Sequence, residues 1–475
     1  MKTPNYTFLK RGMAGVVLVL SFSLIGAQCT GPTGGGKALQ QASQPVVLQY
    51  WRVFDEQDRL APIITAYSQL HPNVSIEYKR FRYEEYERAL LEAFAEDRGP
   101  DIFSIPNNDI DHHFTKLLPL LPQMTTATLV EEGLLQKKKV PQIMVTKGLT
   151  GADMRRQFVD TANDDVIRHD ADGNEQIMAL PLAIDTLALY YNKDLLNNAG
   201  IADPPHTWQE FVDDVQKMTV VDENTGELKQ SAAAFGAGAN IQRSPDILAT
   251  IMMQRGTRMV TGGRVDFTAV PQIKDPESMP AVDSMFLYTD FASPIRPAYT
   301  WSEDMPDSFE AFAQKRTAFF FGYSYHAQML HERAPDVRFG VTPMPQFSES
   351  YKVTAANYWV EAVSKKTAHP DYAWDFIQFA TAAKNVVPYL EQTGRPTALR
   401  ELIESQLKKE DVGPFASQVL FARNWYHGRA PDQMEKAFVE AITASLASKG
   451  GGRSAEGPKL QAILDKAREK IQEGY

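Results

Sequence analysis

Residues 179–211 read ALPLAIDTLALYYNKDLLNNAGIADPPHTWQEF, and this stretch decides the expected fold. Apolar runs at 176–182 and 187–191 predict two buried strands, and a helix is expected to follow at 192–199. A second helix is predicted at 208–218, because two prolines precede it and a threonine stands at its N-cap. Strand and helix therefore alternate through the middle of the chain.

The residues before this stretch repeat the alternation. Segments 46–54, 74–78 and 101–105 have the apolar and β-branched character of strands, and helical spacing at 60–70 and 83–96 separates them. Strands that alternate with helices form sheets in which neighbours run parallel. This part of the chain is therefore predicted to be an α/β lobe with a mainly parallel sheet.

The residues after the stretch predict a second group of elements. Strands are expected at 317–322, 339–342 and 358–363. Helices are expected at 372–383, 432–448 and 459–472. The C-terminal third is thus mostly helical, and no repeat of fixed period is visible.

The first residues have the layout of a secretory signal. A basic start is followed by an apolar run at 13–25, too short to favour a membrane-spanning helix, and by small residues that end at Cys29. We expect residues 1–28 to be a signal peptide and Cys29 to be lipidated, with plain secretion as the alternative. Residues 29–44 are rich in Gly, Ser, Gln and Pro and are predicted to be a flexible tether. Their sequence GPTGGGK lacks the hydroxyl residue that completes a phosphate-binding loop.

Composition narrows the class of protein. The chain has 475 residues, 43% of them hydrophobic and 23% charged, which are ordinary values for a globular protein of two or three domains. The net charge is -10 without a basic block, so nucleic acid and anionic membrane surfaces are not expected as partners. The single cysteine leaves the mature chain with no disulfide.

At this point the chain resembles the extracellular solute-binding proteins of the large sugar-binding family, which includes maltodextrin-binding receptors. The resemblance extends from Val46 onward, and 179–211 carries its most specific part: a crossing strand, an acidic residue, YYNKDL, a helix and PP-x-TW. Shorter similar pieces are LQYWRVFDEQ at 48–57, GPDIFSIP at 99–106, TAFFFGYSY at 317–325, FGVTPMPQ at 339–346 and AHPDYAWDFIQFAT at 368–381.

The resemblance implies a periplasmic-binding-protein-like α/β fold of two lobes with a ligand cleft between them. Crossings between the lobes would lie near 181–186, 353–358 and 411–414. One lobe would comprise residues 45–182 with 354–410, and the other residues 183–353 with 411–475. Such a protein is a monomeric receptor without cofactor or catalytic activity, anchored by lipid in the cell envelope. It binds a sugar, expected here to be an oligosaccharide, and delivers it to the permease subunits of an ABC importer.

A sugar site needs polar groups for the hydroxyls and aromatic planes for the ring faces. The family places such groups after its first strands, where this chain has Trp51, Asp55, Asn107 and Asn108. Asp185 stands at the first crossing, matching a position that often carries an acid facing the cleft. The alternatives are a core aromatic for Trp51 and a hinge hydrogen bond for Asp185.

Further candidates lie later in the chain. Relatives commonly have a stacking Trp where this chain has Tyr323 and Tyr325. The remaining candidate ligand-binding residues are Asn240 in a Gly-rich loop, Arg395 in TGRP, and Trp425 with Tyr426 between C-terminal helices. Trp301 and Trp359 also come into question, with a core position preferred for Trp359, and an exposed turn is the alternative for Arg395.

Two other classes of protein remain as alternatives. An envelope hydrolase would use Ser324 in GYSYH, although His326 stands where a nucleophile elbow needs a small residue. A surface scaffold or adhesion lipoprotein could keep the fold without transport. No metal site is expected, because HExxH is absent, His112 and His113 lack spaced partners, and 170–174 places its glycine too early for a calcium loop.

Residues 124–166 fit the family pattern poorly. They include the run Lys137-Lys138-Lys139 and are interpreted as an insertion or as a rim over the cleft. The identity of the sugar is left open by the sequence, because one fold holds many ligands with different loops.

Overall fold

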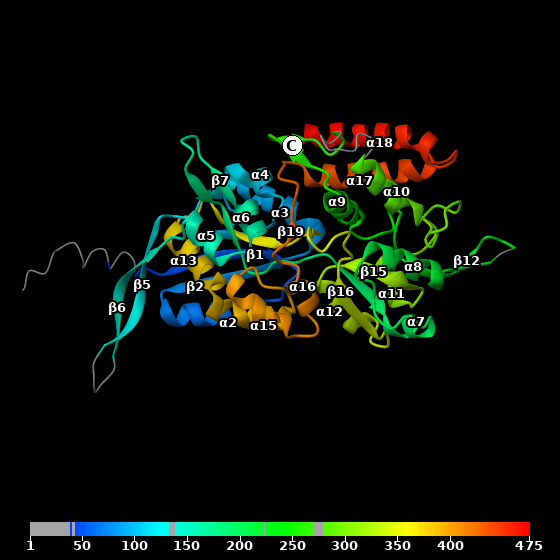
Figure 1. Cartoon of the computed structure of the whole chain (residues 1–475). Helices are drawn as coiled ribbons and strands as arrows, with labels where there is room; N and C mark the ends of the chain where they lie inside the picture. Colours follow the sequence, from blue (N-terminus) through cyan, green and yellow to red (C-terminus); the bar gives the residue numbers. More distant parts are fainter. Residues whose placement is uncertain (1–38, 40–42, 133–137, 223, 270–278) are drawn as a thin grey trace, which may run out of the picture.

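The structure, a computed structural model, describes residues 39, 43–132, 138–222, 224–269 and 279–475. The predicted signal peptide, Cys29 and most of the tether lie outside the described residues. The described elements form two lobes that lie side by side (Figure 1). Among the described residues, none of the helices combines the length and the apolar character that crossing a membrane requires.

The first lobe is built on a six-stranded sheet. Its strands are β1 (Val46–Val53), β2 (Val74–Phe81), β3 (Ile102–Pro106), β4 (Leu117–Leu118), β9 (Ala179–Pro181) and β18 (Trp359–Ser364). β1 lies between β2 and β3 and is parallel to both, which confirms the parallel arrangement predicted for the first strands. β18 pairs with β3 in the antiparallel sense, because it joins the sheet only after the chain has returned from the second lobe.

Helices cover this sheet on both sides (Figure 1). They are α2 (Gln57–Leu70), α3 (Tyr83–Ala95), α4 (Ile110–His113), α5 (Gly151–Gln157), α6 (Asp160–Val166), α13 (Pro370–Thr381), α14 (Ala383–Thr393) and α15 (Ile403–Leu407). The core between helices and sheet contains Leu48, Phe103 and Trp374, all fully buried. α2 begins three residues before the predicted 60–70, because its first turn is polar and lacks the apolar spacing used for the prediction.

The second lobe is built on a mixed five-stranded sheet in the order β11-β12-β15-β10-β16. The strands are β10 (Ala188–Asn192), β11 (Val220–Val221), β12 (Leu228–Ala233), β15 (Thr317–Gly322) and β16 (Phe339–Pro343). β10 is antiparallel to both β15 and β16, whereas β12 is parallel to β15. All six residues of β15 are buried, as its continuous apolar sequence predicts.

The helices of the second lobe include α8 (Trp208–Met218), which has the predicted bounds. Thr207 caps it by accepting a hydrogen bond from the backbone N–H of Glu210. The other helices are α7 (Lys193–Asn198), α9 (Ser244–Gln254), α10 (Pro280–Asp290), α11 (Ser308–Ala313), α12 (Tyr325–Arg333), α16 (Gly413–Ala416), α17 (Pro431–Ala447) and α18 (Arg453–Glu473). α17 and α18 pack side by side on this lobe at the C-terminal end of the chain (Figure 1).

The chain passes between the lobes at segments that contact one another. It leaves the first sheet at β9 and enters the second at β10, and it returns between β16 and β18 through β17 (Thr354–Ala355). β17 pairs with β19 (Ala422–Arg423), and the backbone N–H of Asn357 donates to the carbonyl oxygen of Asp185 at 3.1 Å. The expected lobe boundaries, 45–182 with 354–410 and 183–353 with 411–475, stay a prediction.

Three hairpins of the described residues lie outside the two main sheets. β7 (Ile167–His169) and β8 (Glu175–Ile177) pair with each other, so the single strand predicted at 176–182 is wrong: β8 and β9 belong to different sheets. β5 (Gln123–Glu132) and β6 (Lys138–Lys147) form a long hairpin that extends from the first lobe away from the second (Figure 1). The interpretation of 124–166 as a rim over the cleft is therefore wrong for this hairpin. The third pair, β13 (Val260–Thr261) and β14 (Arg264–Val265), is short.

Candidate ligand-binding site

A cavity lies between the two lobes, with an empty volume of about 370 Å³ that includes space open to solvent. It is lined from the first lobe by Asn107 and Asn108, from the second lobe by Arg243, Asp246, Ala249, Met253 and Met434, and from the crossing segments by Ala355, Ala356, Asn357, Arg423, Asn424 and Trp425. Four asparagines and two arginines thus face this space together with one indole. Asparagine offers both donors and an acceptor, so the lining can pair with hydroxyl groups in either sense.

The carboxylate of Asp165 positions much of this lining. It is fully buried in α6 and accepts hydrogen bonds from Asn107 Nδ2 at 2.9 Å and from Asn424 Nδ2 at 2.9 Å. His427 Nε2 lies 2.8 Å from the same carboxylate, and the hydroxyl of Tyr358 also donates to it. One buried charge therefore orients asparagines that come from segments more than 300 residues apart.

Charged side chains border the cavity on the second lobe. Arg243 has a positive φ of 59° directly before α9, and its guanidinium contacts Asp246 at 2.8 Å and Glu435 at 2.9 Å. Burial by itself lowers the pKa of Arg243, but the two carboxylates outweigh it and raise that pKa well above the ordinary value. Asp246 also accepts a hydrogen bond of 2.6 Å from the hydroxyl of buried Tyr323.

An aromatic platform stands on the first lobe at the end of β1. It consists of Phe54, Tyr83 and Trp359, with the rings of Phe54 and Tyr83 stacked at 5.8 Å and 15°. Phe54 is 52% exposed and Tyr83 56% exposed, which is unusual for large aromatic side chains that pack on one another. Burial raises the pKa of Tyr83, and the carboxylates of Glu435 and Asp432 in the second lobe raise it further.

Asp55 and Arg395, both expected to bind ligand, lie together in the first lobe. Asp55 accepts from Arg395 Nη1 at 2.9 Å and from the Tyr389 hydroxyl at 2.9 Å, and Arg52 Nη2 lies 3.0 Å away. Burial would raise the pKa of Asp55, but the positive charges of Arg52 and Arg395 lower it below its usual value. Glu361 lies beyond Arg52, at 3.3 Å, in this buried network. The carboxylate of Asp55 is thus bonded to side chains of its own lobe.

Asp185 lies at the first crossing, and its carboxylate accepts hydrogen bonds from other residues of the second lobe. Its carboxylate accepts from the backbone N–H of Ser324 at 3.0 Å, from the Ser324 hydroxyl at 2.7 Å and from the Thr186 N–H at 2.9 Å. The serine hydroxyl therefore donates to a carboxylate, whereas a nucleophilic serine donates to an imidazole. Buried His326 instead accepts from the N–H of Tyr323 at 3.0 Å, and burial lowers its pKa to about 3.

The other predicted site residues are dispersed. Asn240 bonds to the carbonyl oxygens of Ser302 and Met305 at 3.0 Å each and so holds a loop of the second lobe. The Tyr426 hydroxyl lies 3.1 Å from the carbonyl oxygen of Gly474, near the C-terminus. The remaining aromatic candidates lie apart from one another. Trp51 packs on Phe81, and Tyr325 is 41% exposed beside Tyr323. Trp301 is buried against Asn240, and Trp359 belongs to the aromatic platform.

Of the predicted residues, the structure brings Asn107, Asn108 and Trp425 to the cavity. Sequence reasoning missed Arg243, Asp246, Asn357, Arg423 and Asn424, which complete the lining. The only available signal was that Arg423 and Asn424 directly precede a candidate aromatic. Arg243 and Asp246 lay in an ordinary loop and helix start, and Asp165 lay in the segment without a functional account.

The comparison with protein families gives one match over most of the chain. The family described as bacterial extracellular solute-binding protein matches residues 55–387. Among individual sequences, a multiple sugar-binding protein of Streptococcus mutans serotype c (strain ATCC 700610 / UA159) is 21% identical over 286 residues, covering 60% of this chain and 66% of that protein. The match covers 45% of the length of three putative binding proteins from Brucella abortus and Brucella suis. The chain thus spans less than two thirds of the length of these curated relatives.

Solved structures show the same two-lobed fold. A cyclic alpha-maltosyl-1,6-maltose binding protein from Arthrobacter globiformis aligns with a TM-score of 0.65 and 16% identity over 90% of this chain and 98% of its own. The GacH receptor of Streptomyces glaucescens GLA.O, solved unliganded and with acarbose, aligns with a TM-score of 0.64 and 17% identity over 91% of this chain and 99% of its own. The two-lobed prediction is therefore confirmed.

Proposed function

This chain belongs to the family of bacterial extracellular solute-binding proteins, and we propose that it captures a carbohydrate in the cavity between its lobes. The observation that carries the proposal is the lining itself, in which amide and guanidinium groups from both lobes surround one space beside the indole of Trp425. Sugar hydroxyls pair with such groups, and the apolar face of a sugar ring packs on an aromatic plane.

The ligand is an oligosaccharide rather than a single sugar. The aromatic platform of Phe54, Tyr83 and Trp359 offers a second apolar surface outside the cavity lining, with two exposed rings. A chain of sugar units can place one ring in the cavity and another on the platform, and this would use both surfaces at once. In this proposal Asp55 and Arg395 bind each other within the first lobe, and Asp185 holds the backbone at the first crossing, through the bonds described above.

Ligand binding is coupled to movement of the lobes. Asn107 and Asn108 come from the first lobe and Arg243 from the second, so a ligand that contacts all three stabilises the arrangement in which the lobes are close. The membrane permease subunits of an ABC importer recognise that arrangement and accept the sugar. The chain acts outside the cytoplasm as a monomer, attached to the membrane by a lipid on Cys29.

Isothermal titration calorimetry of residues 30–475 with maltodextrins, other oligosaccharides, polyols and amino acids tests the proposal. We expect 1:1 binding to one class of oligosaccharide, weakened at least about tenfold by Arg423→Ala, because a buried charged donor typically contributes more than about 1.4 kcal/mol. Arg88→Ala is the matched control, since Arg88 is 79% exposed on α3, and it should bind as the wild type does. If no sugar binds, the scaffold alternative replaces the receptor.

A further inference from the structure

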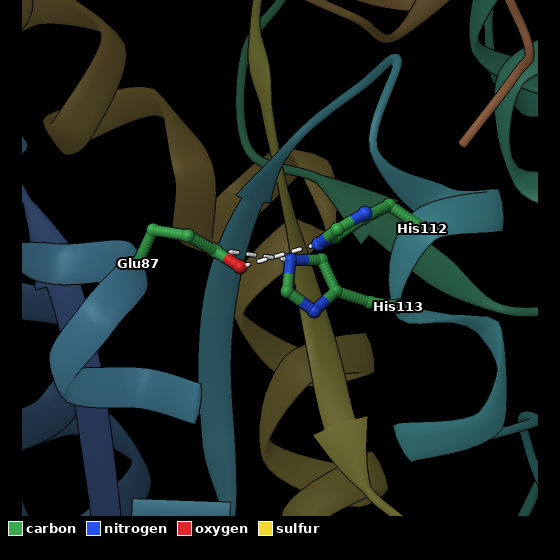
Figure 2. Close-up of side chains that lie close together, drawn as sticks. All are labelled: Glu87, His112 and His113. Carbon is green, nitrogen blue, oxygen red and sulfur yellow. Dashed lines mark hydrogen bonds and ion pairs between the residues drawn. The ribbon is translucent and has the colours of Figure 1, made fainter. Parts of the chain in front are cut away.

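A second cluster of ligand-type side chains lies on the first lobe, outside the cavity lining. Glu87 of α3 faces His112 and His113 of α4, and both imidazoles point toward the same carboxylate (Figure 2). His112 Nε2 and His113 Nε2 each lie 3.3 Å from an oxygen of Glu87. The expectation that these histidines lack partners was therefore wrong, because the third group comes from another helix, 25 residues earlier in the chain.

The spacing of these atoms fits a divalent metal ion. One candidate ligand atom from each residue lies within 4.8 Å of the others. Zinc binds imidazole nitrogen and carboxylate oxygen at about 2.0–2.2 Å with tetrahedral geometry, which separates neighbouring ligand atoms by about 3.3 Å. The two histidines now face different oxygens of Glu87. Because this side chain is 47% exposed, it can rotate to share one ion with both.

The orientation of His112 suits a metal ligand. His112 Nδ1 lies 2.8 Å from the carbonyl oxygen of Arg429, which only accepts hydrogen bonds, so Nδ1 carries a hydrogen. The other ring nitrogen, Nε2, faces the carboxylate of Glu87 at 3.3 Å. A metal ion on Nε2 retains the bond to the backbone, as metal-bound histidines usually do.

His113 supplies an independent observation. Its side chain is fully buried, Nε2 makes only the 3.3 Å contact with Glu87, and Nδ1 has no hydrogen-bond partner in the described part of the chain. Buried polar atoms without partners are rare in folded proteins. Coordination of a metal ion between Nε2 and the Glu87 carboxylate satisfies both groups.

We propose that Glu87, His112 and His113 bind one Zn²⁺ ion, with water as the fourth ligand. Two imidazoles and one carboxylate favour Zn²⁺ over Mg²⁺ and Ca²⁺, which prefer oxygen ligands throughout. The ion joins α3 to α4. It also fixes the His112 ring in the form that donates to Arg429, just before α17, so the site links the first lobe to a segment of the second.

The test is calorimetric titration of untagged residues 30–475 with zinc chloride. The wild type should bind one equivalent, whereas His112→Asn and Glu87→Gln should each weaken binding at least about tenfold, since even outer-shell changes cost about 10–100-fold. Both side chains are partly exposed, at 38% and 47%, so these variants should fold even if a change at buried His113 does not. His206→Asn, at an exposed histidine of the second lobe, should bind zinc like the wild type.

Cobalt substitution and a magnesium control complete the test. Co²⁺ should give the visible absorption of a tetrahedral complex in the wild type, and this absorption should be lost in His112→Asn, while Mg²⁺ should show no binding heat. Equal zinc affinity in the wild type and in all variants would mean adventitious surface binding and would overturn the proposal. Absence of stoichiometric zinc binding to the wild type would overturn it as well.

Discussion

The buried carboxylate of Asp185 should make the stability of the protein depend on pH in the mildly acidic range. Burial raises the pKa of Asp185 from 3.8 to about 6, although the two hydrogen bonds from Ser324 act in the opposite direction. The folded protein therefore holds this proton more tightly than the unfolded chain does. Its contribution to stability is fully present below the unfolded pKa of 3.8 and is lost as the pH rises through about 6. At about 1.36 kcal/mol for each pKa unit, the loss amounts to about 3 kcal/mol.

Urea unfolding followed by tryptophan fluorescence, for the wild type and Asp185→Asn, measures this loss. The variant cannot titrate at this position. The free energy of unfolding of the wild type minus that of the variant should therefore fall by about 2.4 kcal/mol between about pH 4 and pH 7, which is most of the total loss. Taking the difference removes other titrating groups, such as Asp214, whose pKa is also raised to about 6. A difference that is constant over this range, or that rises with pH, would refute the reasoning.

Two further predictions concern the aromatic platform and the carboxylate of Asp165, which positions part of the cavity lining. Tyr83→Ala should weaken oligosaccharide binding about five- to tenfold in calorimetry, since a lost aromatic contact costs about 1 kcal/mol, whereas Tyr351→Ala, 54% exposed in another loop, should have no effect. If Tyr83→Ala binds normally, the platform does not contact the ligand. Asp165→Ala should lower the free energy of unfolding by about 3 kcal/mol, because it leaves two buried and two partly buried polar groups without their acceptor. The exposed neighbour Asp164→Ala is the control in urea unfolding, and equal losses in both variants would contradict this role of Asp165.

The order of strands and helices could be predicted because local patterns specify it. β15 is mainly apolar and is buried at every position, and α8 begins at the cap that its Thr207 signals. What could not be predicted is which strands share a sheet. β8 and β9 are separated by one residue and read as one apolar segment, yet β8 pairs with β7 and β9 with β18. Pairing over such distances depends on the assembled core, which a local pattern does not contain.

The candidate site shows the same limit in its polar residues. Asp55, Asp165 and Asp185 are all buried aspartates near the ends of elements, and the sequence offers no means of ranking them. In the structure, each carboxylate accepts at least three hydrogen bonds or ion pairs from its own chain. Such partners offset part of the cost of burying a carboxylate, and they leave these oxygens less available for a ligand.

The asparagines and arginines of the cavity differ in this respect. Asn108, Asn357 and Arg423 line the cavity. The three buried aspartates instead mainly determine where neighbouring side chains point. A substitution in the first group should therefore change ligand affinity at nearly constant stability, whereas a substitution of the buried aspartates should change stability first. Both groups are polar side chains near the ends of elements, and the partners contributed from distant segments distinguish their roles. For this reason the family resemblance located the cavity more reliably than it identified the side chains that line it.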